Sequence, residues 1–167
     1  MAFTCDVCGE THAGETRDIR MGLPQPIFLL DEDERLSRAY VDDDFAVLHG
    51  PNGDRYFVRA LLELPIVADE DGYFGYGAWV EVSEADAAAL GELWHDEEGE
   101  QAAPFSGELA NELSPYAFTE GLPVRIRLRD VQLLPHVELE DGEHELVRAQ
   151  RYGISQHRAH QLAATVS

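Results

Sequence analysis

The stretch FAVLHGPNGDRYFVRALLEL, residues 45–64, predicts a β-hairpin. Both arms of this stretch are rich in aromatic and β-branched residues, which favour strands. Between the arms, the segment 51–53 (Pro-Asn-Gly) supplies the backbone conformations that a tight turn requires. Because the two strands of a hairpin run antiparallel, the stretch favours an antiparallel sheet.

Two further strands are predicted beyond the hairpin. YFGYGAWVEV, residues 73–82, follows an acidic turn, and its Gly75 and Gly77 indicate a bulge or a close approach of another backbone segment. VRIRLRDVQLL, residues 124–134, alternates apolar and polar residues, which is typical of a strand with one buried face. The alternation places Val124, Ile126 and Leu128 on one face and Arg125, Arg127 and Arg129 on the other.

Short helices are predicted before and after these strands. Asp31 is placed to cap a helix in DEDERLSRAY, and Ser83 is placed to cap one that ends near Trp94. Two more helices are expected near the C-terminus, in residues 143–150 and 155–166. Strands with helices at their ends, rather than regularly between them, favour an α+β fold.

The segment 104–123 is interrupted by glycines and prolines, and we expect it to be an ordered surface loop. The chain shows no repeat, linker or composition break, so we expect a single domain over residues 1–167. The predicted fold class is α+β, with a mainly antiparallel sheet, short helices and an N-terminal CxxC zinc-knuckle-like turn. Residues 1–14 would form this knuckle-like N-terminus, packed on the α+β body.

The chain of 167 residues carries 33 acidic and 12 basic side chains, for a formal net charge of -21. So negative a surface disfavours nucleic acids and anionic membranes. The excess is concentrated, because fifteen acidic and no basic residues lie between Arg59 and Arg125. The acidic region 60–124 is either a solvated face or a docking surface for a basic protein. The start of the chain lacks the features of a signal peptide, and we expect a cytoplasmic bacterial protein.

The only two cysteines form the pattern Cys5-Asp-Val-Cys8, which is followed by His12. A C-x2-C pair aims two thiolates at one point, as structural zinc requires, and His12 is a candidate third ligand. The fourth ligand would come from far along the chain or from water; the protein candidates are His144, His157, His160, His49 and His136. A redox-active pair and two inert thiols are the alternatives.

The other patterns give weaker support for a functional site. The pair His157 and His160 can share one helix face, but no acidic base stands beside it as in metal-dependent hydrolases. The arginine face of residues 124–134 could clamp a phosphate or carboxylate, although pairing with acidic residues of the same chain is the simpler use. No nucleotide-binding or nucleophile-elbow motif is present, so nothing in the sequence indicates an enzyme.

The whole chain resembles a bacterial family known as a domain of unknown function (family 2199). The similar stretches are CDVCGETH, RYFVRALLELPI, FGYGAWVEVS, PFSGELANELSPY and HVELEDGEHELVRAQRYGIS. This resemblance implies no activity, substrate or catalytic residue. It implies that Cys5, Cys8 and His12 match a CxxCGxxH pattern, and that His144 stands where similar proteins have a histidine, which favours His144 as the fourth metal ligand.

Three hypotheses about function follow. The first is a zinc-stabilised protein-binding domain without catalysis. The second is an acidic, immunity-type neutraliser of a basic partner, and the third is a small metal-dependent hydrolase with an open position on its metal.

Overall fold

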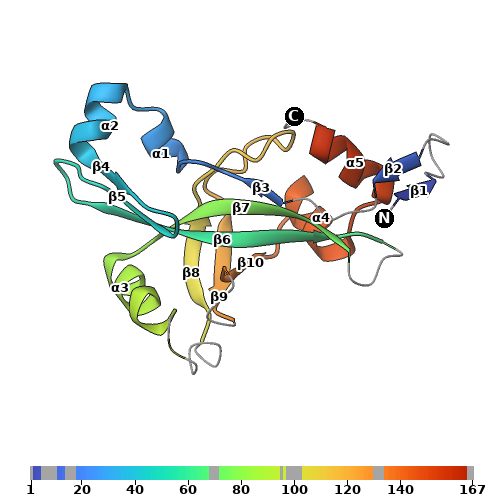
Figure 1. The fold of residues 1–167 in the computed structure, drawn as a ribbon. Coiled ribbons are helices and arrows are strands. Elements are labelled where there is room, and N and C mark those ends of the chain that lie inside the picture. Colours follow the sequence, from blue (N-terminus) through green and yellow to red (C-terminus); the bar gives the residue numbers. More distant parts are fainter. Residues whose placement is uncertain are drawn as a thin grey trace.

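The structure, a computed structural model, describes residues 2–4, 11–13, 18–67, 72–94, 96, 103–129 and 134–164. In chain order its elements are β1 (Ala2–Thr4), β2 (Thr11–Ala13), β3 (Asp18–Arg20), α1 (Gln25–Phe28), α2 (Glu32–Arg38), β4 (Ala39–Val41), β5 (Phe45–Leu48), β6 (Arg55–Pro65), β7 (Tyr73–Val82), α3 (Glu84–Leu93), β8 (Phe105–Leu109), β9 (Pro123–Arg127), β10 (His136–Leu139), α4 (Glu145–Tyr152) and α5 (Gln156–Ala164) (Figure 1).

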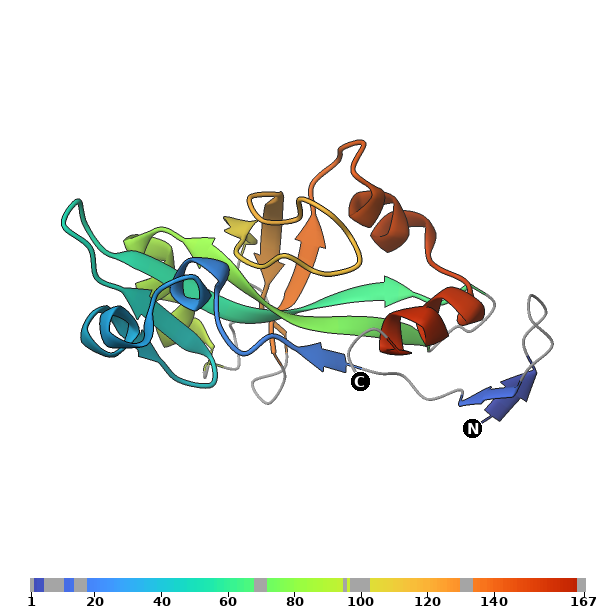
Figure 2. The ribbon, with the colours of Figure 1, turned by 90° about the horizontal axis from the view of Figure 1, so that it is seen from above.

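The predicted hairpin is confirmed as β5 and β6, which pair antiparallel with Phe45 opposite Val58 and Leu48 opposite Arg55. In the turn, Gly53 adopts a φ of 121°, a conformation that residues with a Cβ rarely reach. The predicted third strand is also confirmed. β7 pairs antiparallel with β6 from Tyr73 to Val82, and the two strands run side by side along most of the molecule (Figure 2).

Within the described residues, five strands close into a mixed barrel. β8 pairs with β7, β9 with β8 and β10 with β9, all antiparallel. The ring closes where β10 pairs in parallel with β6, through His136 opposite Leu61 and Val137 opposite Leu62. The expected α+β class with mostly antiparallel pairing therefore holds in its coarse form. The knuckle-like turn at Cys5 and Cys8 lies outside the described residues.

The prediction of a loop over 104–123 is wrong for its first part, which forms strand β8. Gly107 makes this strand possible, because a Cβ there would lie 2.6 Å from Val80 Cγ1 and 2.7 Å from the Glu81 carbonyl oxygen. A residue that disfavours strands in general is thus required at this position of the barrel wall.

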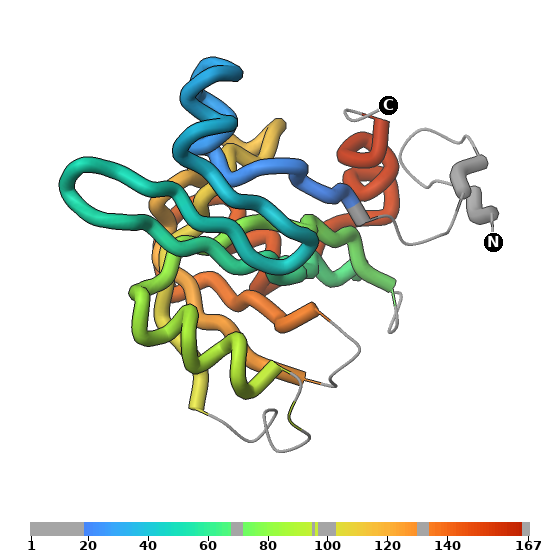
Figure 3. The backbone as a smooth tube through the Cα atoms, turned by 60° about the vertical axis from the view of Figure 1, so that its left-hand side comes forward, coloured from blue at the N-terminus to red at the C-terminus, as the bar shows by residue number. Residues whose placement is uncertain are grey.

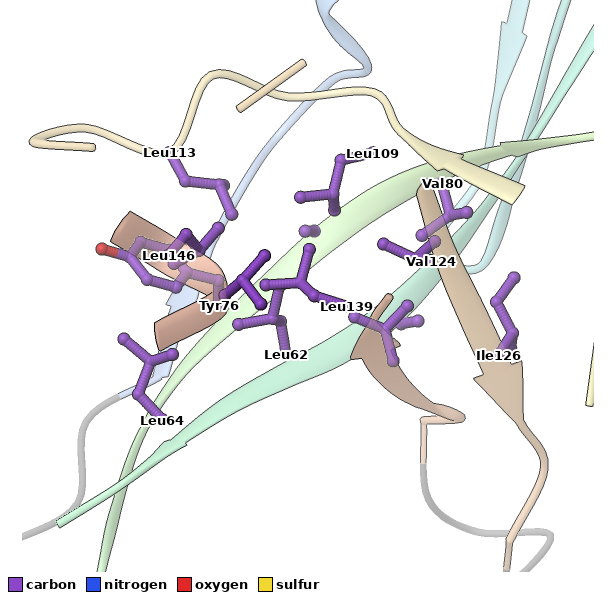
Figure 4. Close-up of a cluster of buried hydrophobic side chains, with 14 of the residues drawn as sticks. Leu62, Leu64, Tyr76, Val80, Leu109, Leu113, Val124, Ile126, Leu139 and Leu146 are labelled. Carbon is purple, nitrogen blue, oxygen red and sulfur yellow. The ribbon is translucent and has the colours of Figure 1, made fainter. Parts of the chain in front are cut away.

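The barrel interior is filled by the apolar faces of its strands (Figure 4). Alternate residues point inward because successive side chains of a strand lie on opposite faces. The predicted alternation is confirmed in β9, where Val124 and Ile126 are fully buried and Arg125 and Arg127 are exposed. α4 packs against β6 at the barrel end, and its Leu146 completes this core.

A second apolar cluster lies on the outer side of the β6–β7 pair. Trp79 and Phe57 pack there against Ile27 of α1. β5 and β4 extend the sheet from β6, and β3 pairs in parallel with β7, opposite Gly75 and Gly77. At Gly77 a Cβ would lie 3.6 Å from the Arg20 Cα, which is an ordinary contact, so the pairing with β3 does not by itself require a glycine there. None of the helices in the described part of the chain is long and apolar enough to span a membrane.

The predicted helix caps are confirmed. The side chain of Asp31 accepts a hydrogen bond from Glu34 N at 2.8 Å, and that of Ser83 accepts one from Asp86 N at 3.1 Å. At the other end of the chain, Ser155 Oγ accepts from Arg158 N at 3.0 Å, at the start of α5. Each cap satisfies an amide that the first turn of a helix leaves without a partner.

A side-chain amide takes part in closing the barrel. Gln150 of α4 accepts a hydrogen bond from Leu139 N at 2.7 Å and donates one to the Val137 carbonyl oxygen at 2.9 Å. These are bonds to the backbone of β10 at and beyond the last residue that pairs with β6. β6 pairs with β10 as far as Val137, and the amide of Gln150 then takes the place of β6 as the hydrogen-bonding partner of the next backbone groups of β10.

The buried side chain of Asn111 joins three segments that are distant in sequence. Its Oδ1 accepts from Trp79 N at 2.7 Å, and its Nδ2 donates to the Leu23 carbonyl oxygen at 2.8 Å. Its own carbonyl oxygen accepts from the hydroxyl of Thr119, which is also fully buried. The segment before α1, the wall strand β7 and the loop after β8 are thus held by one amide.

We predict that Asn111→Ala lowers the free energy of unfolding by about 2–4 kcal/mol, because it leaves Trp79 N–H and the Leu23 carbonyl buried without partners. Chemical denaturation measures this loss. Asn52, in the exposed turn between β5 and β6, is the matched control, and Asn52→Ala should change stability by about 0.5 kcal/mol or less. Equal losses in the two variants would contradict the role given to Asn111.

Gly153 joins α4 to α5 in a conformation with a φ of 83°. A Cβ at this position would lie 2.9 Å from the Pro65 carbonyl oxygen. The same carbonyl accepts a hydrogen bond from Ile154 N at 2.7 Å, so the end of α4 is tied to the end of β6.

We predict that Gly153→Ala destabilises the protein by at least about 1–2 kcal/mol, because alanine pays a backbone penalty at positive φ and also meets Pro65. Gly91 is the control. It lies inside α3 with nothing within 4 Å of an added Cβ, so Gly91→Ala should stabilise the protein by about 0.5–1 kcal/mol. Thermal unfolding of both variants checks the opposite signs.

Candidate functional site

The residues predicted to bind zinc are only partly described. Cys5 and Cys8 lie outside the described residues. His12 belongs to β2, where its backbone pairs with Phe3. The zinc site at the N-terminus therefore stays a prediction.

His144, the predicted fourth ligand, has both ring nitrogens engaged in hydrogen bonds. Its Nδ1 accepts from Leu146 N at 3.0 Å and thereby caps α4. Its Nε2 lies 2.7 Å from the Ala117 carbonyl oxygen, to which it donates in the tautomer that leaves Nδ1 free to accept. A metal ion at His144 would have to displace one of these bonds.

The other candidate histidines belong to three different parts of the fold. His49 forms a pair with Asp54 at 3.1 Å, and His136 lies 4.0 Å from Glu63. Burial lowers the pKa of His136, while the charge of Glu63 acts against this shift. His157 and His160 both lie on α5. Among the described residues, no group of three or more histidine, cysteine, aspartate or glutamate side chains is arranged to hold a metal ion.

The arginine face of β9 is neutralised within the chain, as the simpler expectation had it. Arg125 lies 3.2 Å from Glu140, and Arg127 lies 3.7 Å from Glu138 on the neighbouring strand β10. Arg129 reaches Glu63 of β6 at 3.4 Å. These pairs lie on the outer surface of the barrel, where each contributes at most about 1 kcal/mol. They leave no anion clamp on this face.

The acidic region 60–124 contributes to two surfaces. Glu84, Asp86 and Glu92 belong to α3. Glu81, Glu108 and Glu120 surround Arg55, and all three raise the pKa of this guanidinium, Glu81 most strongly through a hydrogen bond. The pair between Arg55 and Glu81 has two hydrogen bonds, of 2.9 and 2.7 Å.

Exposed large apolar side chains are concentrated in the segment around α1 and α2, for which the sequence predicts only a capped helix. We call residues 24–44 the α1–α2 lobe; it comprises α1, α2, β4 and the turn after β4 and projects from the barrel beside the β5–β6 hairpin (Figure 3). Four large apolar side chains of the lobe are exposed: Phe28 by 59%, Leu29 by 71%, Leu36 by 77% and Tyr40 by 59%. Elsewhere in the described chain, the large apolar side chains exposed to this degree are Val67, Phe118 and Tyr152, which belong to separate segments.

Hydrogen bonds from two arginines hold the lobe together, although four of its large apolar side chains are exposed. Arg35 donates to three carbonyl oxygens around the end of α1, those of Ile27, Phe28 and Leu30, at 3.4, 3.0 and 3.1 Å. Arg38 donates to the His49 carbonyl oxygen at 2.9 Å, which ties α2 to the end of β5. Both basic residues of the lobe are thus used in holding it together.

Acidic side chains lie between and after these apolar residues in the sequence. The lobe contains seven carboxylates, at residues 31–34 and 42–44, and only two guanidinium groups. Asp31 caps α2, Glu34 pairs with Arg38 and Asp43 pairs with Arg20. The surface therefore combines apolar area with a marked excess of negative charge, which suits a partner with apolar and basic side chains.

Sequence reasoning missed this surface because a leucine in a helix is ordinarily expected to be buried. One signal was available. α2 has seven residues with Leu36 as its only large apolar side chain, so the helix has no apolar stripe to turn inward, and none of its residues is buried.

A scan against protein-family models gives a match over residues 4–154, to the family described as "Uncharacterized protein conserved in bacteria (DUF2199)". Searches of curated proteins and of solved structures give no match. The family match covers most of the chain, including the barrel, the α1–α2 lobe and α4. The chain therefore belongs to the DUF2199 family of bacterial proteins.

Proposed function

We propose that this protein is a protein-binding domain without catalysis, and that the α1–α2 lobe is its contact surface. The observation that supports the proposal is the exposure of Phe28, Leu29, Leu36 and Tyr40 within thirteen residues of one another. Burying one such side chain against a partner contributes about 1.5–3 kcal/mol. Four of them can therefore supply the centre of an interface, while scattered apolar residues cannot.

The partner that we propose is a segment with apolar side chains on one face and lysine or arginine around them. The carboxylates at 31–34 and 42–44 would steer such a segment to the lobe and speed association at low salt. They would also repel an acidic segment of the same hydrophobicity. The apolar contacts thus give the affinity and the charges give the choice of partner.

We predict that a basic amphipathic peptide binds the wild-type protein, and that Leu29→Ser with Leu36→Ser weakens this binding at least tenfold. Fluorescence anisotropy with labelled peptides measures the affinity. Tyr152→Ser, which removes an equally exposed side chain outside the lobe, is the control and should bind as the wild type does. Because all three side chains are exposed, the variants should keep the wild-type melting temperature.

Two comparison peptides sharpen the experiment. An acidic amphipathic peptide tests the role of charge, and a basic peptide of scrambled order tests the role of the apolar face. The proposal would be contradicted if the acidic peptide bound as tightly as the basic one. It would also be contradicted if the variant with Leu29→Ser and Leu36→Ser kept the wild-type affinity for the basic peptide. Affinity for the basic peptide should fall as salt is raised.

A second candidate function is the neutralisation of a basic protein by the acidic region 60–124. It is favoured by the carboxylates that α3 presents and by the glutamates around Arg55, which form acidic surfaces distinct from the lobe. Charge reversal on α3, by Glu84→Lys with Glu92→Lys, separates the two candidates. These substitutions should weaken the binding of a basic partner only if α3 is the docking surface. The hydrolase hypothesis depends on the undescribed N-terminal cysteines and gains no support from the described residues.

We further propose that Cys5, Cys8 and His12 hold a structural zinc ion that stabilises the N-terminus. The support is the ligand pattern of the sequence. The two hydrogen bonds of the His144 ring support a capping role for this residue, so the fourth ligand would be another histidine or water.

We predict that protein purified without chelator or affinity histidines contains about one zinc per chain, and that Cys5→Ser with Cys8→Ser removes it. His144→Ala should keep the zinc and lower stability by about 1–2 kcal/mol, because the cap of α4 and the bond to Ala117 are lost. Elemental analysis and thermal unfolding give the two results. Loss of zinc from the His144 variant would instead make His144 the fourth ligand.

A further inference from the structure

The chain contains two asparagines, Asn52 and Asn111, and they lie in opposite environments. Asn111 is only 1% exposed, and both polar atoms of its amide are bonded to backbone groups. Asn52 is exposed in the turn between β5 and β6, and Gly53 follows it directly. Asn52 therefore combines an accessible side-chain amide with a glycine as the next residue, whereas Asn111 has neither.

The side chain of an asparagine can react with the main-chain nitrogen of the next residue, because that nitrogen can reach Cγ and close a five-membered ring. A side chain on the next residue crowds this approach, and glycine has none. Apart from its chain neighbours, Gly53 also has no heavy atom within 4 Å of the position that a Cβ would take. The space beside the attacking nitrogen is therefore open.

The backbone of this turn can adjust to allow the attack. Gly53 has a φ of 121°, and a glycine can leave this conformation for others at little cost. Its N–H donates to the Gly50 carbonyl oxygen at 3.2 Å, which is at the long end of the usual range for such bonds. Residues 51–54 are all exposed, so water can replace this bond when the turn opens briefly.

We propose that Asn52 is a site of spontaneous deamidation, through a succinimide formed with the main-chain nitrogen of Gly53. This nitrogen forms a bond to Cγ of Asn52 while the bond from Cγ to Nδ2 breaks. Nδ2 leaves as ammonia, together with the hydrogen that the Gly53 amide gives up. The later step consumes only water, and the modification does not depend on the proposed protein binding.

Water opens the ring by breaking one of the two carbonyl bonds to the Gly53 nitrogen. If the bond to Cγ breaks, the ordinary main chain is restored and position 52 holds an aspartate. If the bond to the original main-chain carbonyl carbon breaks, position 52 holds an isoaspartate, and the main chain then runs through Cβ and Cγ. Either product replaces a neutral amide with a carboxylate, in a chain whose net charge is already -21.

The two products should affect the hairpin differently. Aspartate adds a charge close in sequence to Asp54, which pairs with His49 at 3.1 Å, but it leaves the main chain as it was. Isoaspartate lengthens the main chain by one carbon between Gly50 and Gly53, whose hydrogen bond closes the turn. The strands pair from Leu48 opposite Arg55 onward, so the extra length cannot be taken up by the turn without disturbing it.

The test is incubation of the purified full chain at physiological temperature and slightly alkaline pH, followed by peptide mass spectrometry. The peptide that contains Asn52 should gain the mass difference between an amide and an acid at least tenfold faster than the peptide that contains Asn111. Because isoaspartate forms through the ring, both isoaspartate and aspartate should be found at position 52. The conversion should be faster at higher pH, because the attacking nitrogen must lose its hydrogen.

Two variants serve as controls. Asn52→Gln keeps an amide at the same place but would need a six-membered ring, which closes far more slowly, so this variant should stay unmodified over the same time. Asn52→Asp supplies the aspartate product directly. After separation by ion exchange, the aspartate form should melt as Asn52→Asp does, and the isoaspartate form should melt lower by at least about 2 °C.

Three outcomes would overturn the proposal. Equal rates at Asn52 and Asn111 would show that exposure and the following glycine do not decide the reaction. Conversion to aspartate without isoaspartate would mean direct hydrolysis of the amide instead of a ring. If a free peptide of residues 49–56 converted while the folded chain did not, the turn would be protecting Asn52 from attack.

Discussion

The pairing of β6 with β7 is the constraint on which the rest of the structure depends. These strands are longer than the others, and they stay paired from Tyr56 opposite Val82 to Pro65 opposite Tyr73. These strands form the barrel together with β8, β9 and β10, while their outer faces receive α1 and the segment before α1, and β3 extends the sheet from β7. The α1–α2 lobe is carried by β5 on β6, and Arg59 faces Trp79 across the pair itself.

Much of the local structure could be predicted, because it depends on residues close together in sequence. The hairpin at 45–64, the alternation of β9 and the caps at Asp31 and Ser83 each have a local signal, and each is confirmed. β8 and β10 lack such a signal. β8 contains Gly107, which local preference counts against a strand, and β10 has four residues that pair with strands far away along the chain. Barrel closure by a parallel pair is a non-local event that no short pattern encodes.

The candidate surfaces were harder to predict than the fold, because a residue's role depends on what its neighbours leave unsatisfied. The arginines of β9 were correctly expected to pair within the chain, since acidic residues are so abundant. Arg59 could not be told apart from them in the sequence, because its burial follows from the indole and the β4–β5 turn that fold over it. Leu36 likewise reads as an ordinary core residue until the shortness of α2 is known. The N-terminal cysteines give the clearest chemical pattern in the sequence, and they lie outside the described residues.

The side chain of Gln150 completes the hydrogen bonding of β10 at one end of the barrel wall. Where β10 stops pairing with β6, the wall is completed by an amide carried on α4 instead of by another strand. The barrel and the helix are therefore mechanically linked, because α4 cannot move away without opening the wall at Leu139. Slow exchange of the Leu139 amide hydrogen would then report the docking of a helix, although the residue itself belongs to a strand. The residue that completes the hydrogen bonding of the barrel wall thus lies on a helix, outside the sheet.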